Sequence, residues 1–366
     1  MNKNKVAVAM SGGVDSSVCA YLLKEQGYEV IGITMQIFDD ASGESKAKEG
    51  SCSTEAVQDA RLVAKNLGIP HYVVNLKHCF NEKVIKYFIS EYLSGKTPNP
   101  CIVCNKYLKF TELLKEAFKL DAFYLATGHY ARVEYDDALS RYILKKSVDS
   151  DKDQSYVLYG LTQQQLEHVL FPLGNYTKKE IRRIAQKIGL SVSDKPDSQE
   201  ICFIDTNYRD FLYKKAPDKI KEGPFIDTNG KVIGKHKGIP FYTIGQRKGL
   251  GISAGKPLYV VDIDAENNAV VLGDEKDLYT KEFVASQTNW VSIDTPCEKF
   301  NANVKIRYNF IEKPAEIIPL NGDTVKVIFE NPQKAVTPGQ SAVFYKGDLV
   351  LGGGVIQRRC LPEKSF

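Results

Sequence analysis

Three cysteines are the residues of this sequence best suited to carry out chemistry. Cys101 and Cys104 form a CxxC pair in the segment TPNPCIVCNKYLKF, and Cys202 lies in the polar stretch SDKPDSQEICFI. Eight cysteines in 366 residues are too few for a disulfide scaffold, so a close pair points to catalysis or metal binding. It could be half of a zinc site, a redox disulfide, part of an iron–sulfur site or two catalytic thiols.

Zinc and thioredoxin-like chemistry lack the partners they require. A structural zinc ion takes four ligands, whereas no second CxxC or HxxxH follows the pair and His129 stands alone. A thioredoxin-like pair lies where a strand enters a helix of a small βαβ domain, but this pair follows Pro98-Asn99-Pro100. Catalytic thiols and an iron–sulfur site remain.

Cys104 has the local features of a reactive thiol. Lys106, Lys109 and the start of the helix expected over Leu108–Phe118 would lower its pKa and favour the thiolate. Cys202 lies in an irregular stretch next to an expected domain boundary, where functional loops concentrate. We interpret the other cysteines as structural or incidental, although the polar surroundings of Cys52 would suit a reactive thiol; they are Cys19, Cys52, Cys79, Cys297 and Cys360.

A second chemical site is predicted at AMSGGVDSS, residues 9–17, between an expected strand and an expected helix. Gly12 and Gly13 allow a sharp turn and a close backbone approach to a ligand. The serine hydroxyls and the helix N-terminus add donors and partial positive charge, which suits phosphate or pyrophosphate. Asp15 is an acid in this anion site, which indicates a bridging Mg²⁺. No GxxxxGK[ST] occurs in the chain, so the loop is not of the Walker A type.

Strands alternating with helices are expected to position these residues. The buried runs at 6–10, 29–35, 71–76 and 122–130 predict strands, and the apolar spacing at 16–26, 53–68 and 82–93 predicts helices. A helix over 177–189 is expected to start with a capping box of Thr177 and Glu180. This alternation indicates a doubly wound parallel α/β sheet.

The second half of the chain changes to short β-type runs with turn signals such as Asn229-Gly230 and Asn321-Gly322. We expect an α/β catalytic domain over residues 1–205, a small central mixed or β domain over 206–280, and an all-β barrel over 281–366. The polar stretch at 38–50 is interpreted as a mobile loop.

The composition is that of a soluble globular protein, and the net charge of +4 permits an RNA or nucleotide partner without requiring one. The N-terminal apolar run is too short for a secretory signal, and no stretch approaches the ~20 apolar residues of a membrane span. We therefore expect a cytoplasmic protein.

The loop SGGVDSS resembles the PP-loop of the ATP pyrophosphatases, which adenylate an oxygen and release pyrophosphate. Seven motifs in order resemble the bacterial tRNA-specific 2-thiouridylases from about residue 5 to 357. They are SGGVDSS, TPNPCxxCNxxxKF, ATGHY, KDQSY, DSQEICFI, YTIGQRKGLG and TPGQSAVFY. The cysteine motifs together with YTIGQRKGLG are much more specific than the PP-loop alone.

The resemblance implies that ATP activates the 2-carbonyl oxygen of a wobble uridine as an adenylate. Cys202 would carry a persulfide delivered by a cysteine desulfurase or a sulfur-relay protein, and Cys104 would be the nucleophile that frees the sulfur or closes a Cys104–Cys202 disulfide. Exchange of oxygen for sulfur needs adenylation, because AMP leaves far more readily than the carbonyl oxygen. It then needs a soft nucleophile, which a persulfide provides. The implied ATP-binding residues, with Mg²⁺ near Asp15, are Ala9, Met10, Ser11, Gly12, Gly13, Val14, Asp15, Ser16, Met35 and Gly128.

The resemblance also implies where tRNA binds. Asn99, Pro100 and Cys101 would lie beside the target base, which must be splayed out of the anticodon loop. Further implied tRNA contacts are His129, Lys152, Asp153, Gln154, Arg307, Tyr308 and Gln340. The partners would be tRNAs of the Lys, Glu and Gln type, and we expect a monomer.

Cys101 departs from the family pattern, because many members have Asp, with a general acid/base role, at this position. A thiol is a poor substitute for a carboxylate. The change instead supplies three thiols, Cys101, Cys104 and Cys202, which would suit a four-iron cluster with one open iron. Persulfide chemistry is the favoured interpretation and the cluster version the alternative.

Two rival functions have weaker support. A PP-loop synthetase would share the adenylation step but leaves Cys104 and Cys202 without a purpose. A non-catalytic RNA-binding protein that senses nucleotide would tolerate Cys104→Ser.

Overall fold

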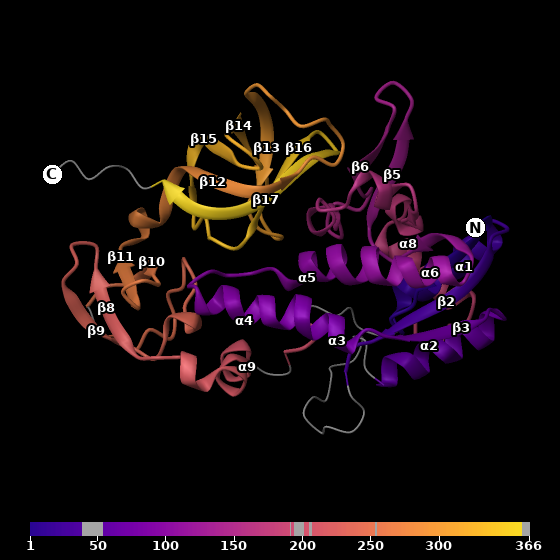
Figure 1. Cartoon of the computed structure of the whole chain (residues 1–366), viewed down its shortest axis with the longest axis horizontal. Helices are drawn as coiled ribbons and strands as arrows, with labels where there is room; N and C mark the ends of the chain where they lie inside the picture. Colours follow the sequence, from indigo (N-terminus) through magenta and orange to yellow (C-terminus); the bar gives the residue numbers. More distant parts are fainter. Residues whose placement is uncertain (39–53, 191, 194–200, 205–206, 253–254, 361–366) are drawn as a thin grey trace.

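The computed structural model describes residues 1–38, 54–190, 192–193, 201–204, 207–252 and 255–360. Within these ranges the strands form three sheets, of five, four and eight strands. The loop predicted over 38–50 and Cys52 fall almost entirely outside the described residues. Figure 1 shows the α/β region on the right, the barrel above and the small central sheet at the lower left. No helix in the described ranges is long and apolar enough to cross a membrane.

The first sheet is parallel, with the order β3-β2-β1-β4-β7. Val6 and Val8 of β1 are buried in one core cluster and Ala7 in another, because alternate side chains of a strand face opposite sides. Both faces are therefore covered, and the predicted doubly wound α/β fold is confirmed. The strands are β1 (Asn2–Ala9), β2 (Glu29–Gln36), β3 (His71–Asn75), β4 (Ala122–Ala126) and β7 (Val169–Leu170).

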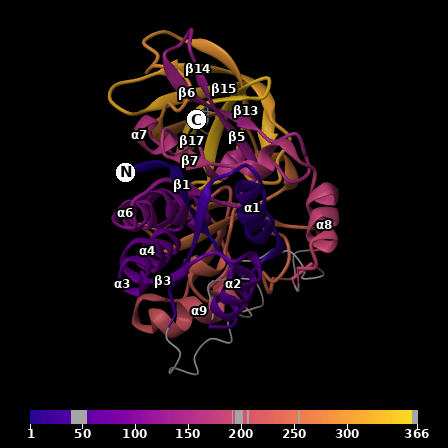
Figure 2. The same cartoon turned by 90° about the vertical axis from the view of Figure 1, so that its right-hand side faces the viewer.

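Helices cover the two faces in separate groups (Figure 2). Those that share the core of Val6 and Val8 are α1 (Val14–Glu25), α2 (Thr54–Leu67) and α8 (Lys178–Lys187). Those that share the core of Ala7 are α3 (Lys77–Phe80), α4 (Lys86–Leu93), α5 (Pro100–Val103) and α6 (Leu114–Lys119). Helix α8 starts with the predicted capping box, in which Thr177 and Glu180 satisfy each other's backbone N–H.

One helical run carries the CxxC pair and starts earlier than predicted. Helix α5 continues through a π-helical stretch, Cys104–Leu113, into α6. The prediction of a helix start at Leu108 was wrong, because the start signal lies in TPNP itself. Asn99 Oδ1 accepts a hydrogen bond from the Cys101 N–H at 3.1 Å, and Pro100 takes the first helical position.

The central sheet is small and mixed, as predicted. Its order is β10-β11-β8-β9, with β11 and β8 parallel and the other pairs antiparallel. Phe225, Val260 and Val270 are fully buried in its core. The strands are β8 (Gly223–Asp227), β9 (Val232–His236), β10 (Tyr259–Asp264) and β11 (Ala269–Gly273), and α9 (Tyr208–Lys215) precedes them.

The C-terminal strands close into the predicted barrel, because β12 pairs with both β15 and β17. They are β12 (Tyr279–Asn289), β13 (Phe300–Lys305), β14 (Lys313–Pro319), β15 (Val325–Lys334), β16 (Ser341–Lys346) and β17 (Leu349–Cys360). A hairpin from the first half of the chain, β5 (Ala131–Asp136) and β6 (Arg141–Lys146), extends this sheet by pairing β6 with β17. The short helix α7 (Gln163–Leu166) follows it. The division at 205 and 280 stays a prediction, since this pairing joins its first and third parts.

Candidate active site

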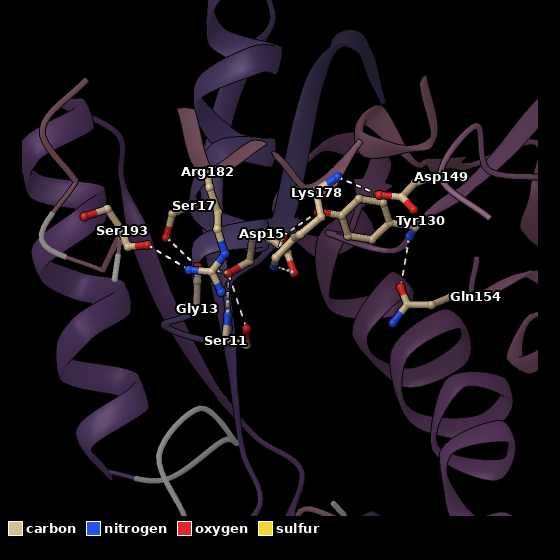
Figure 3. Close-up of polar contacts among 11 residues, drawn as sticks. Ser11, Gly13, Asp15, Ser17, Tyr130, Asp149, Gln154, Lys178, Arg182 and Ser193 are labelled. Atoms are coloured by element: carbon tan, nitrogen blue, oxygen red, sulfur yellow. Dashed lines mark hydrogen bonds and ion pairs between the residues drawn. The ribbon is translucent and has the colours of Figure 1, made fainter. Parts of the chain in front are cut away.

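The nucleotide loop, residues 10–17, connects the carboxyl end of β1 to the N-terminus of α1. Gly12 has φ +71°, and a Cβ there would lie 2.6 Å from the Ala56 carbonyl oxygen of α2, so glycine is required on both grounds. Ser16 Oγ accepts from the Ser11 N–H at 3.1 Å, and Ser17 Oγ donates to the Gly13 carbonyl at 2.8 Å (Figure 3). These bonds hold a turn at the strand edge where open α/β sheets bind ligands.

Gly128 lies against this loop, whereas Met35 lies in the neighbouring strand. A Cβ at Gly128 would lie 2.9 Å from backbone atoms of both Asp15 and Ser16. Met35 is buried near the carboxyl end of β2. The structure therefore brings two predicted ATP-site positions to one sheet edge. Among the other predicted positions, Met10 and Val14 are buried, while Ala9, Ser11 and Gly13 are half-buried.

Asp15 has two partners that lie far away in the sequence. Lys178 Nζ is 2.8 Å from both carboxylate oxygens, and the Tyr130 hydroxyl donates to Oδ1 at 2.8 Å. The sequence predicts neither contact; its one usable signal was the capping box, which places Lys178 in the first turn of a helix. A single carboxylate fits the predicted Mg²⁺, which is commonly held by one or two carboxylates plus substrate phosphates.

The CxxC pair is arranged differently from the prediction. Because the helix starts at Pro100, its first turn contains Cys101, while Cys104 is half-buried one turn further on. Desolvation raises the pKa of the Cys101 thiol, and the Lys109 charge opposes this rise. The helix therefore starts before Cys101 and not after Cys104, which corrects that part of the prediction. The Lys109 charge acts on Cys101, and an effect of Lys106 and Lys109 on Cys104 stays a prediction. A π-helical stretch such as the one that begins at Cys104 is rare and often marks a functional site.

Cys202 is half-buried and anchored by the residue that follows it. The Phe203 ring lies 5.1 Å from that of Phe88 and 5.4 Å from that of Phe211, centroid to centroid. Cys104 and Cys202 pack against the same core cluster, which contains Phe88. Two cysteines from separate motifs therefore share one side of the α/β domain.

The three-thiol arrangement of the cluster alternative is not assembled in the structure. In the described ranges, which include Cys101, Cys104 and Cys202, no three His, Cys, Asp or Glu side chains are grouped so that they could hold a metal ion. We derive no step through a cluster.

The residues predicted to contact tRNA fall into two kinds of environment. His129 is buried among Phe110 and Phe171, and its Nδ1 is 2.7 Å from Thr127 Oγ1. Asp153 is also buried and accepts from the N–H groups of Ser147 and Ser155. The side chains of His129 and Asp153 are therefore packed inside the protein in this structure and do not form part of its surface. Lys152, Gln154, Arg307 and Gln340 are half-buried, and Tyr308 is exposed.

Tyr308, between β13 and β14 of the barrel, interacts with residues from the first half of the chain. Desolvation raises the pKa of the Tyr308 hydroxyl, and the charges of Asp153 and Cys101 act in the same direction. Its ring lies 6.1 Å from that of Tyr156, centroid to centroid. Tyr308 therefore lies within range of the charges of Asp153 and Cys101, although the three residues come from separate motifs.

A second junction forms around Thr97, which precedes the CxxC helix. The Thr97 N–H donates to the Pro338 carbonyl at 2.9 Å, and its carbonyl accepts from Gln340 Nε2 at 2.8 Å. Its hydroxyl donates to Thr243 Oγ1 of the central region at 3.2 Å. A Cβ at Gly339 would lie 2.9 Å from the Thr97 nitrogen. Thr97 and Gly339 belong to two of the motifs quoted above, but no role was predicted for either of them. All three regions of the chain meet here.

The chain is similar to known proteins in each of its three regions. Three family models match: the tRNA methyl transferase HUP domain over residues 4–206, the tRNA methyl transferase PRC-barrel domain over 209–274 and the Aminomethyltransferase beta-barrel domain over 280–356. A solved 4-thiouridine synthetase in complex with RNA and ATP is 18% identical, with a TM-score of 0.35, over 59% of this chain and 51% of that chain.

Curated relatives match over almost the full length of the chain. The tRNA-specific 2-thiouridylase MnmA 2 of Caldanaerobacter subterraneus subsp. tengcongensis is 60% identical over 97% of this chain and 98% of its own. The tRNA-specific 2-thiouridylase MnmA of Acetivibrio thermocellus is 56% identical over 98% of this chain and 100% of its own. At this identity and coverage, the chain belongs to the family of the tRNA-specific 2-thiouridylases.

Proposed function

We propose that the protein catalyses the ATP-dependent 2-thiolation of the wobble uridine of tRNA. One observation carries the proposal. This chain, a member of the family, has its nucleotide loop and the cysteines Cys104 and Cys202 of the specific motifs in one α/β domain, and both cysteines pack against one core cluster. The family models mention methyl transfer in their descriptions. A phosphate-binding loop and paired thiols suit adenylation and sulfur transfer better than methylation.

The first step is adenylation of the base. The uracil 2-carbonyl oxygen attacks the α-phosphorus of ATP, the bond to the bridging oxygen breaks, and pyrophosphate leaves. Backbone N–H groups of the nucleotide loop would hold the phosphates, Met35 and Gly128 would border the adenosine, and Asp15 would hold a Mg²⁺ that offsets the phosphate charge. This step makes the carbonyl oxygen part of a good leaving group, AMP.

The second step transfers sulfur. The terminal sulfur of a Cys202 persulfide attacks C2 of the base and AMP leaves with the former carbonyl oxygen. The Cys104 thiolate then attacks Cys202 Sγ, so that the S–S bond breaks toward the base and 2-thiouridine is released. A Cys104–Cys202 disulfide remains, which a thiol reductant must return to two thiols before a cysteine desulfurase or relay protein reloads Cys202.

Asn99, Pro100 and Cys101 are proposed to border the splayed base. The half-buried Lys152 and Arg307 would contact the tRNA backbone, and the exposed Tyr308 would stack on a base. We propose wobble-uridine tRNAs of the Lys, Glu and Gln type as substrates and the cytoplasm as the location of a monomeric enzyme.

The test combines purified protein with ATP, Mg²⁺, such a tRNA and a persulfide donor, and measures 2-thiouridine. Cys104→Ser and Cys202→Ser are each expected to abolish the product while tRNA affinity is kept. Cys297→Ser, at an exposed cysteine between β12 and β13, is the matched control and should behave like the parent. If the parent forms no 2-thiouridine, or Cys104→Ser is fully active, the proposal is wrong.

A further inference from the structure

The four residues before Cys101 form a stiff link to the CxxC helix. Pro98 and Pro100 each fix their own φ, and a residue that precedes a proline is restricted to extended backbone. Thr97 and Asn99 both precede a proline, and Asn99 is extended, with φ −111° and ψ 96°. Its side chain caps the helix at the Cys101 N–H. A displacement of Thr97 is therefore passed on to the first helical turn instead of being absorbed by the backbone.

Thr97 is the residue that attaches this link to the other regions of the chain. Its N–H donates to the Pro338 carbonyl and its carbonyl accepts from Gln340, and both partners lie between β15 and β16 of the barrel. Its hydroxyl donates to Thr243 Oγ1 of the central region at 3.2 Å. The backbone and the side chain of one residue are therefore bound to the two regions that follow the α/β domain.

The backbone around Thr97 is also tightly packed on both sides. Gly339 has φ +88°, and a Cβ there would lie 2.9 Å from the Thr97 nitrogen and 3.0 Å from its carbonyl oxygen. A Cβ at Gly95 would lie 2.6 Å from Cγ2 of Ile263 in β10. The chain at 95–97 therefore lies directly against the barrel and the central sheet, which leaves it little room to shift.

We propose that Thr97 is a positioning residue, which fixes the start of the CxxC helix relative to the barrel and the central region. The inference rests on the proposed function, in which Arg307 and Tyr308 of the barrel contact tRNA and residues 99–101 border the target base. Thr97 keeps these two parts of the RNA site in a fixed relative position, so that a tRNA bound by the barrel presents its base to the thiols. Small displacements of a reacting group slow a reaction strongly.

The first test measures single-turnover formation of 2-thiouridine at saturating ATP, tRNA and persulfide donor. Thr97→Val removes the hydroxyl but keeps the branched shape, and it should slow thiolation by about 3- to 10-fold, the value of one neutral hydrogen bond. Affinities for tRNA and ATP should stay within about twofold, because the change affects placement of the base and not binding. Thr97→Ser keeps the hydroxyl and should restore the rate. Thr295→Val, at an exposed threonine between β12 and β13, is the control and should behave like the parent.

A double-mutant cycle tests whether the loss comes from the hydrogen bond to the central region. Thr243→Val and the double variant Thr97→Val/Thr243→Val should each slow thiolation about as much as Thr97→Val alone, because all three remove the same bond. Additive losses would show that the two hydroxyls act separately, and would overturn the link between them.

A second variant displaces Thr97 from the side of the barrel. Gly339→Ala should slow thiolation by about 10- to 100-fold through overpacking against the Thr97 backbone. It should also reduce the protection that bound tRNA gives the exposed Cys101 thiol against N-ethylmaleimide, measured by mass spectrometry. Gly322→Ala is the matched control, because Gly322 also has a positive φ, +72°, in the barrel region but no neighbour within 4 Å of its Cβ position.

The outcomes distinguish this proposal from the proposed function. The positioning role is overturned if Thr97→Val thiolates at the parent rate, if Thr97→Ser restores nothing, or if Gly339→Ala and Gly322→Ala lose equally. A loss of tRNA affinity that accounts for the whole effect would also overturn it. A parent protein that binds tRNA but forms no 2-thiouridine would instead contradict the proposed function, and the protection of Cys101 would still decide the role of Thr97.

Discussion

The nucleotide loop and the thiol segment are built in different ways. The loop is one short turn, fixed by its glycines and by hydrogen bonds between its own residues. The thiols Cys104 and Cys202 come from separate motifs, and their positions depend on a shared aromatic core. Phosphate binding is therefore largely a local property of one turn, whereas a two-thiol reaction is a property of tertiary packing.

The largest expected effect is a loss of ATP affinity, caused by one added methyl group next to the nucleotide loop. Gly128→Ala places a Cβ 2.9 Å from backbone atoms of Asp15 and Ser16. The overpacking should weaken ATP binding by about 10- to 100-fold, measured by calorimetry. Gly160→Ala is the control, because its Cβ would have no neighbour closer than 3.8 Å. Unchanged ATP affinity in Gly128→Ala would contradict the conclusion that the nucleotide loop is tightly fixed.

The position of Cys202, and with it the rate of thiolation, should be sensitive to a change in the aromatic core beside it. Phe203→Leu removes ring contacts next to Cys202 and should cost about 1–2 kcal/mol in unfolding free energy. We expect 2-thiouridine formation to fall by about tenfold while ATP affinity stays within about twofold. Phe225→Leu, in the fully buried core of the central sheet, is the control of comparable cost. Equal losses of thiolation in both variants would mean that global stability, not the position of Cys202, is responsible.

The smallest expected effect concerns His129, which adjoins Gly128 and feels the charge of Lys109. Complete burial, and secondarily Lys109, holds the pKa of His129 well below its ordinary value. Below about pH 6.5 the unfolded chain binds a proton that the folded protein cannot accommodate, so stability falls as the pH falls, by up to about 1.4 kcal/mol per pH unit.

Chemical denaturation between pH 7 and pH 5 would measure this slope. The variant His129→Phe should flatten it, and substitution of the exposed His78 should not. An unchanged slope in His129→Phe would contradict the assignment of a buried neutral imidazole.

Much of the architecture was readable from local patterns. The doubly wound sheet, the mixed central sheet and the barrel were all predicted, and so was the capping box of α8. The start of the CxxC helix was missed although its signal is local, because Asn99 as N-cap and Pro100 at the first helical position were not recognised as a helix start. The helix start was consequently placed beyond Cys104, whereas Cys101 already lies in the first helical turn.

The sequence by itself determined the parts of the site in which a few neighbouring residues do the work. These are the glycine-dependent nucleotide loop, the CxxC pair and the motif around Cys202. Only the tertiary structure decided that Lys178 holds Asp15 across 163 residues, and that Gln340 reaches Thr97 across 243. Strand and helix periodicities report which face of an element is buried, but not which distant polar group will lie opposite it. That choice depends on how the elements within each region, and the three regions themselves, pack together.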